Sequence, residues 1–255
     1  MTRQRTPTRH RKILDLLSDR PEVSVSELST HFGVTTMTIR RDLDQLEQRG
    51  QVRRVHGGAV LAAPSVVAFS FQERRQTHLP EKEAVARAAA GMLEPGMTVI
   101  MDTGTTTLEV ASAMGGIPDL RVLTTSLAIA SRFLAHRNVE LILLGGTLNQ
   151  NSPDLYGGLT QDNLRRFRAD LAIIGADSAN SDGLYTDSQE IAAVSHAMIA
   201  SSERTILVAD SSKFGRVSFV RFATWDEVDT VVVDEGLPAS HRSWLTQRTE
   251  LVLAE

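Results

Sequence analysis

The segment Ser24–Val60, SVSELSTHFGVTTMTIRRDLDQLEQRGQVRRVHGGAV, decides the fold of the N-terminal part of the chain. Ser24 and Glu27 have the spacing of a capping box, which predicts a helix that begins at Val25. Gly33 follows the last apolar residue of this helix, at a position where a left-handed C-terminal stop favours glycine. The pattern therefore predicts one short helix, preceded by residues 8–18 as another, and then a tight turn.

A second helix and a basic hairpin follow the turn. Ile39, Leu43 and Leu46 recur at the spacing of one buried helical face, and Thr35 can cap the helix that carries them. Gly57–Gly58 allow a hairpin turn in the basic ribbon that comes next. This is the layout of a winged helix-turn-helix, which places a helix in the DNA major groove. The residues expected to contact DNA are Thr36, Met37, Thr38, Arg40, Arg41, Arg53, Arg54 and His56.

The charge of the chain is divided unevenly. Residues 1–60 hold 11 Lys and Arg against 7 Asp and Glu, whereas residues 61–255 hold 16 against 24. A basic head on an acidic body is typical of a nucleic-acid-binding module fused to another domain. The alternative is a small helical domain whose arginines are merely solvated. Because caps, hairpin and charge agree, they favour double-stranded operator DNA as the partner.

The same residues carry a family resemblance. TIRRDL, followed by RVHGGA, resembles the N-terminal domain of the DeoR family of bacterial transcriptional regulators. The two motifs occur in the order and at the separation found in that family. The resemblance implies that the first 60 residues bind DNA.

Length and composition restrict the remaining possibilities. A chain of 255 residues with 42% hydrophobic residues fits a small domain and a medium one. No apolar run reaches the roughly 18 residues of a membrane helix, and the basic N-terminus lacks the apolar stretch of a secretory signal. The absence of cysteine excludes disulfides, a thiol nucleophile and a cysteine zinc site. We expect a cytoplasmic protein with no membrane, metal or cofactor.

The chain after the hairpin is expected to form an α/β domain. We expect a winged helix over residues 1–60, a linker over 61–78 and an effector-binding and oligomerisation domain over 79–255. Part of the linker is too apolar for a free tether and should pack on a domain. Helices then alternate with apolar strands, which predicts a mostly parallel sheet covered on both faces. The expected strands are 98–101, 121–124, 140–144, 171–175, 205–209 and 230–233, and the expected helices are 81–93, 106–114, 127–136, 159–166 and 189–200.

Polar residues follow the predicted strands, and ligands bind beyond the carboxyl ends of such strands. Gly104 permits a tight turn after Asp102, and Thr105, Thr106 and Thr107 lead into a helix whose free amides suit a phosphate. Lys213 lies on a loop after another strand and supplies a mobile positive charge. The alternatives are an ordinary helix cap and a solvated lysine. The other effector-site candidates at strand ends are Thr125, Ser126, Gly145, Gly146, Asp177, Tyr185, Asp187 and Glu190.

The resemblance extends over the rest of the chain. DTGTTT, TSL, LLGGTLN, IGA with a following GLYT, AMI and ADSSKFG occur in the order of the DeoR-family sensor domain. That domain is similar in fold to ribose-5-phosphate isomerase, glucosamine-6-phosphate deaminase and CoA transferases. The resemblance implies a repressor of a sugar catabolism operon, released by a phosphorylated sugar intermediate. It also implies that Asp102, Gly104, the three threonines, Gly146 and Lys213 line the effector site.

The chain departs from this family pattern at a few positions. Thr125 stands where many relatives have Asn, and Ser195–His196 stand where many have a basic residue. The segment NSPDLYGG, residues 151–158, receives no assignment. These departures concern the identity of the effector.

Two other functions compete with a ligand-responsive regulator. One is an isomerase or deaminase with an accessory N-terminal domain, in which Asp102, Asp177, Glu190 and Lys213 perform acid–base chemistry. The other is a winged helix that binds proteins. No compact catalytic motif is visible, which favours a regulator with no catalytic residues. Because one winged helix offers few base contacts, we expect a homodimer or homotetramer.

Overall fold

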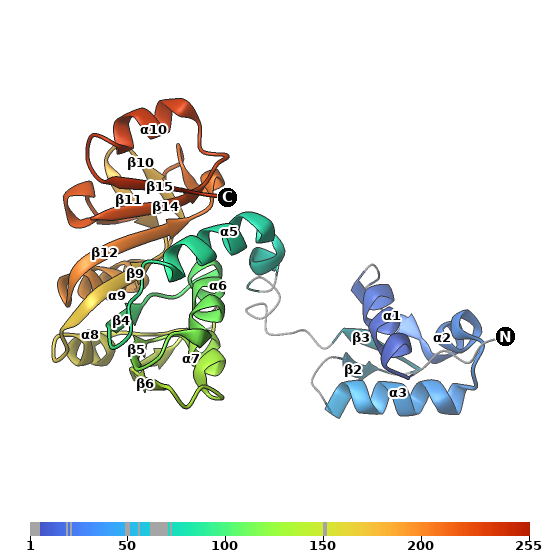
Figure 1. Ribbon diagram of the computed structural model, residues 1–255. Helices are drawn as coiled ribbons and strands as arrows, with labels where there is room; N and C mark the ends of the chain where they lie inside the picture. Colours follow the sequence, from blue (N-terminus) through green and yellow to red (C-terminus); the bar gives the residue numbers. More distant parts are fainter. Residues whose placement is uncertain are drawn as a thin grey trace. The chain divides into compact units, whose positions relative to one another are not determined.

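The computed structural model describes residues 6–18, 20, 22–48, 52–55, 57–61, 71, 73–149 and 152–255. The chain divides into two compact units, Met1–Ser70 and Phe71–Glu255 (Figure 1). The larger unit thus begins inside the range expected to be a linker, and Phe71 is buried in its core. No helix of the described residues is long and apolar enough to cross a membrane.

The smaller unit combines helices with a three-stranded antiparallel sheet of order β1-β3-β2. Its core contains the three residues expected on the buried face of the helix after the tight turn, Ile39, Leu43 and Leu46, together with Ile13 and Leu28. The elements are α1 (Thr6–Ser18), β1 (Val23–Ser24), α2 (Val25–Phe32), α3 (Thr36–Gln48), β2 (Val52–Val55) and β3 (Gly58–Leu61).

The helix ends of this unit are set by local sequence. The side chain of Ser24 accepts a hydrogen bond from the Glu27 amide, and Glu27 bonds back to the Ser24 amide, so the capping box is confirmed. Gly33 ends α2 with a φ of 62°, a conformation that favours glycine. The Thr38 amide donates to the Thr35 hydroxyl at the start of α3, at 3.2 Å.

The larger unit is built on a seven-stranded sheet of order β15-β14-β12-β9-β4-β5-β6, in which all neighbouring strands are parallel. The expected parallel α/β class is confirmed. From β4 the chain adds β5 and β6 toward one edge, and β9 then starts the other half. The strand order therefore reverses between β4 and β9. The strands are β4 (Thr98–Met101), β5 (Leu120–Thr124), β6 (Val139–Leu143), β9 (Ala169–Ile174), β12 (Ser202–Ala209), β14 (Thr230–Asp234) and β15 (Glu250–Ala254).

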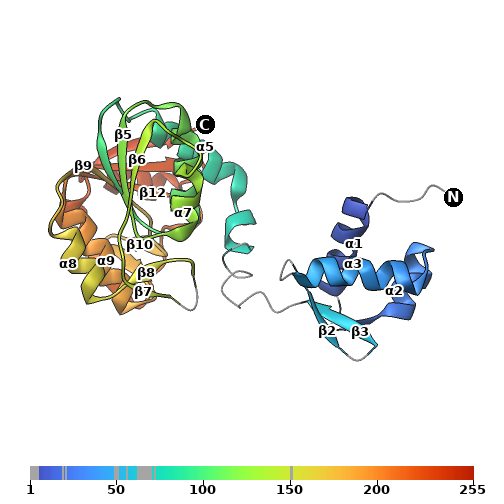
Figure 2. The same cartoon turned by 90° about the horizontal axis from the view of Figure 1, so that it is seen from below.

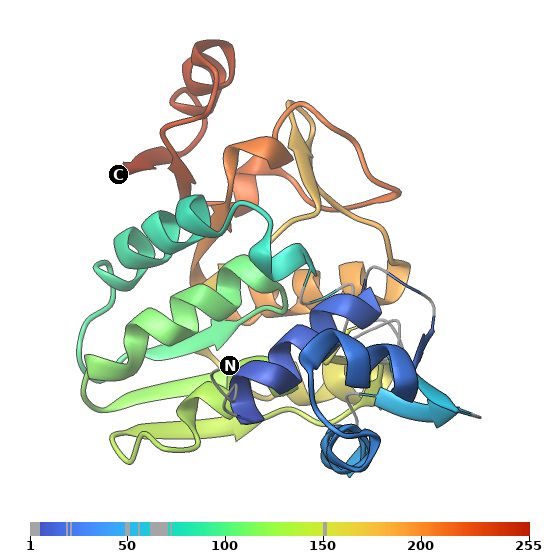
Figure 3. The same cartoon turned by 90° about the vertical axis from the view of Figure 1, so that its right-hand side faces the viewer.

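Helices cover both faces of this sheet. In Figure 2, α5 and α7 lie on one face of the sheet and α8 and α9 on the other. Figure 3 shows α5 and α6 side by side in the first of these layers. The helical elements are α5 (Leu79–Ala90), α6 (Thr105–Ala113), η1 (Met114–Gly116), α7 (Leu127–Phe133), α8 (Gly158–Leu164), α9 (Gln189–Ala200), η2 (Ser211–Lys213), η3 (Trp225–Glu227) and α10 (Ala239–Leu245).

Short strands add two antiparallel sheets that the sequence pattern did not predict. One has the order β10-β11-β13, and the other pairs β7 with β8. Strands of two to four residues are too short to show a clear alternation, and β15 and α10 were missed as well. The added strands are β7 (Thr147–Leu148), β8 (Leu155–Tyr156), β10 (Ser178–Asn180), β11 (Gly183–Thr186) and β13 (Val220–Ala223).

Candidate functional site

The third helix of the smaller unit, α3, presents a polar face to solvent. Arg40 and Arg41 are exposed, and Met37 exposes 61% of its surface, which is unusual for so apolar a side chain. Thr36 is also exposed, while Thr38 is half-buried and joins the cap of the helix. The candidate DNA-reading residues thus lie opposite the buried leucines.

A buried charge network fixes α3 against α1. Asp42 accepts hydrogen bonds from Arg9 Nε at 2.6 Å and Arg9 Nη2 at 2.9 Å, and His10 Nε2 lies 3.1 Å from the same carboxylate. The bond to Asp42 raises the pKa of Arg9. Bidentate contacts of this kind are geometrically specific, so they orient the helix as well as hold it. Sequence reasoning missed this network, because Asp42 looks like any other helical acid.

The hairpin residues differ from one another. Arg53 on β2 is exposed, whereas the Arg54 guanidinium donates to Asp44 Oδ1 at 2.5 Å and the Arg54 amide donates to Glu47 Oε1 at 2.8 Å. Arg54 therefore joins the hairpin to α3 in this structure, and its contact with DNA stays a prediction. His56, expected to contact DNA, lies outside the described residues.

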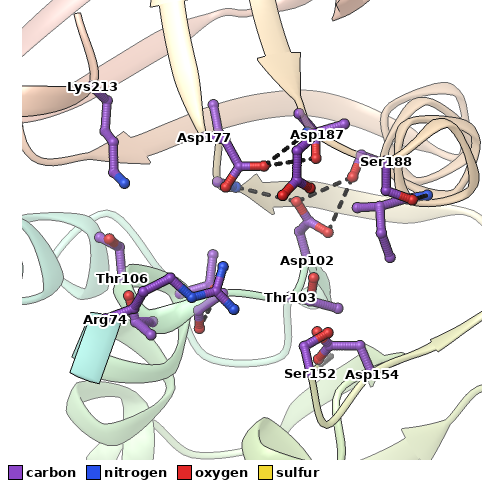
Figure 4. A pocket seen from close by; sticks show the side chains of 18 of the residues that line it. Arg74, Asp102, Thr103, Thr106, Ser152, Asp154, Asp177, Asp187, Ser188 and Lys213 are labelled. Carbon is purple, nitrogen blue, oxygen red and sulfur yellow. Dashed lines mark hydrogen bonds between the residues drawn. The ribbon is translucent and has the colours of Figure 1, made fainter. Parts of the chain in front are cut away.

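A cavity of about 620 Å³ opens in the larger unit, and every residue that lines it belongs to that unit (Figure 4). It lies beyond the carboxyl ends of β4, β9 and β12, where Asp102, Gly175 and Asp210 follow their strands. Because the strand order reverses between β4 and β9, this is the crevice in which open α/β sheets bind ligands.

The first turn of α6 forms one end of the cavity. Its N-cap is Gly104, with a φ of 133°, a backbone conformation that side chains rarely adopt. Because glycine has no side chain to cap the helix, the amides of Thr105, Thr106 and Thr107 remain available for an anion. The Thr107 hydroxyl instead donates to the Gly104 carbonyl at 3.1 Å, which braces the turn.

Positive side chains gather at the same end. Lys213, on the short turn η2 and not on an open loop, lines the cavity together with Arg74, Lys82 and Arg216. Figure 4 shows Arg74 and Lys213 on the side of the cavity that holds Thr106. This end therefore pairs a helix N-terminus with cationic side chains, which is the chemistry of a phosphate site.

Lys82 holds Arg74 in place. Its ammonium group is buried and donates to the carbonyls of Arg74 and Thr77, at 2.5 and 2.8 Å. Burial lowers the pKa of Lys82. The neighbouring Arg75 donates to Glu109 of α6 at 2.7 Å. The residues just before α5 are thus anchored to the larger unit, whereas the sequence had assigned them to the linker.

Carboxylates gather at the opposite end, apart from Asp210, which precedes η2 and whose charge acts on Lys82. Asp102 is buried and accepts hydrogen bonds from the Gly175 amide at 3.3 Å and from the Ser195 hydroxyl at 3.2 and 3.3 Å. Burial raises the pKa of Asp102 to about 7, and the charge of Asp154 adds to the shift. Asp177, Asp187 and Glu190 also line the cavity, as expected.

Two of these acids are held by their neighbours. Asp177 accepts from the Thr186 hydroxyl at 2.8 Å and from the Asp187 amide at 3.2 Å. Ser188 caps α9 by accepting from the Ile191 amide and donates its hydroxyl to Glu190. The acidic wall is therefore fixed by the strand–helix junction between β11 and α9.

Five residues expected at the effector site lie outside this cavity: Thr125, Ser126, Gly145, Gly146 and Tyr185. Thr125 is buried, and Ser126 caps α7 through the Ile129 amide. A side chain at Gly146 would collide with the backbone of Tyr156, so this glycine serves a close chain crossing. Tyr185 alternates with Thr186 along β11, and it is Thr186 that lines the cavity.

The unassigned segment 151–158 contributes three lining residues, Ser152, Asp154 and Tyr156. Asp154 could have been predicted, because it is a charged residue in a glycine-containing segment that follows a strand. Arg74 offered no comparable signal. Within the described part of the chain, no group of three or more His, Asp or Glu residues is arranged to hold a metal ion.

Comparison with known proteins agrees with this two-part layout. Residues 9–65 match the DeoR-like helix-turn-helix domain, and residues 77–235 match the DeoR C terminal sensor domain. The chain is 35% identical to a putative aga operon transcriptional repressor of Escherichia coli O157:H7, over 92% of this chain and 88% of that protein. It is 36% identical to the glycerol-3-phosphate regulon repressor of Escherichia coli K12, over 93% and 94%.

A ribose 5-phosphate isomerase of Methanocaldococcus jannaschii is similar with a TM-score of 0.41 and 16% identity, over 54% of this chain and 55% of that one. The family assignment depends on the matched domains and on the repressors, which align over nearly their whole length. The chain therefore belongs to the DeoR family of DNA-binding transcriptional regulators.

Proposed function

We propose that this protein represses a sugar catabolism operon and is released from its operator by a phosphorylated sugar that occupies the cavity of the larger unit. The observation that carries the proposal is the positive end of that cavity. There the uncapped first turn of α6 and two cations, Arg74 and Lys213, line one space. Helix amides and cations together favour a phosphate over a neutral sugar.

The smaller unit supports a DNA-reading role. Arg40 and Arg41 are exposed on α3, and Arg53 is exposed on the adjacent hairpin. We propose that one of the α3 arginines reads a base edge and that the other residues contact phosphates. Two such units on one operator raise the affinity through effective concentration, so we also propose a dimer or a higher assembly.

Arg74 supplies a path from effector to operator. It lies four residues beyond Ser70, the last residue of the smaller unit, and it lines the cavity. A ligand shifts an equilibrium only by its difference in affinity between two states. A phosphate that binds Arg74 in one state alone would therefore favour that state over the other.

The test is a mobility-shift titration with DNA from upstream of the protein's own gene. A panel of sugar phosphates should release the operator, whereas the same sugars without phosphate should not. Failure of every sugar phosphate to release the DNA would contradict the proposal. Sustained product formation from a sugar phosphate at roughly 1 per second or faster, a rate typical of enzymes, would also contradict it.

A further inference from the structure

We propose that the effector carries a protonated amine at the end away from its phosphate, so that the cavity selects an amino sugar phosphate. The inference builds on the function proposed above and adds the class of sugar. Positive and negative side chains are largely separated across the cavity. Figure 4 shows Lys213, Thr106 and Arg74 on one side, and Asp102, Asp187 and Asp154 on the other.

Among the described residues the acidic side contains no ion pair, although the charge of Arg74 acts on Asp154 from a distance and opposes the rise in its pKa that burial causes. Ion pairs occur elsewhere in the molecule, but within the described residues none involves the five carboxylates of this side, Asp102, Asp154, Asp177, Asp187 and Glu190. Asp102 is buried against a hydroxyl and a backbone amide, from Ser195 and Gly175. A buried carboxylate that lacks a cation is costly, so it is rarely retained without a use.

Asp154 provides a second and independent observation. Its side chain is 3% exposed, it lines the cavity, and its Oδ1 atom has no hydrogen-bond partner among the described residues. Buried polar atoms in folded proteins almost always have a partner. Burial raises the pKa of the Asp154 carboxyl, and hydrogen bonds from the side chains of Ser152, Ser126 and Thr103 oppose that rise. The Oδ1 atom receives none from the described residues within bonding geometry and is left for a donor on a ligand.

Asp102 and Asp154 act on each other. Burial raises the pKa of both groups, and the charge of Asp154 raises that of Asp102 further. A protonated amine placed between them would relieve the repulsion and donate up to three hydrogen bonds, including one to Asp154 Oδ1. A neutral sugar hydroxyl could donate one bond but would leave the two charges unbalanced.

The competing use of this pair is a neutral carboxyl. If Asp102 stays protonated, it can donate to an oxygen of a neutral sugar phosphate, and no amine is needed. The two uses differ in which ligand binds best. A cationic ligand gains from both carboxylates, whereas a neutral ligand gains from neither charge.

The experiment measures dissociation constants for the full chain by isothermal titration calorimetry at about pH 7.5. The probes are glucosamine 6-phosphate, glucose 6-phosphate and N-acetylglucosamine 6-phosphate, repeated with the galacto and manno epimers. The free amine should bind at least about tenfold tighter than both neutral counterparts in one of these series. Asp102→Asn and Asp154→Asn should each bring the ratio of amine to neutral dissociation constants toward one.

Asp226→Asn is the matched control, because Asp226 is exposed and lies outside the cavity, and it should keep the parent ratio. Equal or tighter binding of the neutral sugars by the parent would overturn the inference and leave the proposed function intact. A preference that survives both cavity substitutions would also overturn it. If no sugar phosphate binds the parent, the proposed function itself fails.

Discussion

The two units treat a buried aspartate in opposite ways. In the smaller unit Asp42 is enclosed by Arg9 and His10, so its charge is balanced within the protein. In the larger unit Asp102 is enclosed by a hydroxyl and an amide, and no described cation pairs with it. The balanced acid holds two helices together, whereas the unbalanced acid faces a cavity. The contrast separates a residue used for architecture from one kept for a ligand.

Removing the balanced acid should have the largest effect. Asp42→Ala would leave Arg9 buried without its partner, and breaking a buried pair in this way costs about 3–5 kcal/mol. Chemical denaturation of the full chain, followed by circular dichroism, should show the smaller unit unfolding earlier. The matched control is Asp44→Ala, which breaks the partly exposed ion pair with Arg54. This change should lower the free energy of unfolding by less than about 1 kcal/mol. Equal losses for the two variants would remove the distinction between them.

Removing the unbalanced acid, Asp102, should instead increase the stability of the larger unit at neutral and higher pH. The pKa of Asp102 is raised to about 7 in the folded chain from an ordinary value of 3.8, so the folded state binds more protons between these limits. The free energy of unfolding should therefore fall as the pH rises from about 4 to about 7 and level off above that. Asp102→Asn should reduce this dependence to the part that comes from Asp154, and should stabilise the larger unit at pH 8 by up to about 4 kcal/mol. Destabilisation at pH 8, or an unchanged pH profile, would contradict the prediction.

Features that depend on residues close together in the sequence could be predicted from the sequence. The caps at Ser24 and Gly33 were predictable, because they involve residues three to five apart. Asp102 and the start of α6 were predictable because they follow a continuous apolar strand directly. These features need no knowledge of distant contacts.

Other features depend on contacts that sequence does not reveal. Arg74 lines the cavity because the buried Lys82 fixes the backbone before α5, by donating to the carbonyls of Arg74 and Thr77. Tyr185 was expected at the site and lies outside the lining, because a single-residue step along a strand moves a side chain to the other face. The pairing of Asp42 with Arg9 spans 33 positions and left no local pattern.

Substitutions at the positive end of the cavity should weaken the response to the effector. Lys213→Ala should raise the effector concentration needed to release the operator about 10- to 100-fold, because charge-assisted contacts contribute about 1.5–3 kcal/mol. Arg74→Ala should act in the same direction. The matched control is Arg137→Ala, an exposed arginine outside the cavity, which should leave the midpoint unchanged. Each variant is compared with its own operator affinity in the absence of effector. Equal midpoints for Lys213→Ala and the parent would exclude this lysine from the switch.

The smallest changes in free energy are expected on the exposed face of α3, where Arg40 and Arg41 face solvent. Replacing whichever of Arg40 and Arg41 reads a base should cost about 1–3 kcal/mol of operator binding and relax sequence preference. Replacing a phosphate-contacting residue, such as Arg53, should weaken specific and non-specific DNA alike and reduce the salt dependence. Mobility shifts on operator and scrambled DNA at about 50 and 150 mM salt separate the two classes of contact. If the double variant Arg40→Ala, Arg41→Ala folds and binds operator as tightly as the parent, α3 is not the reading helix, and the network that orients it through Asp42 has another purpose.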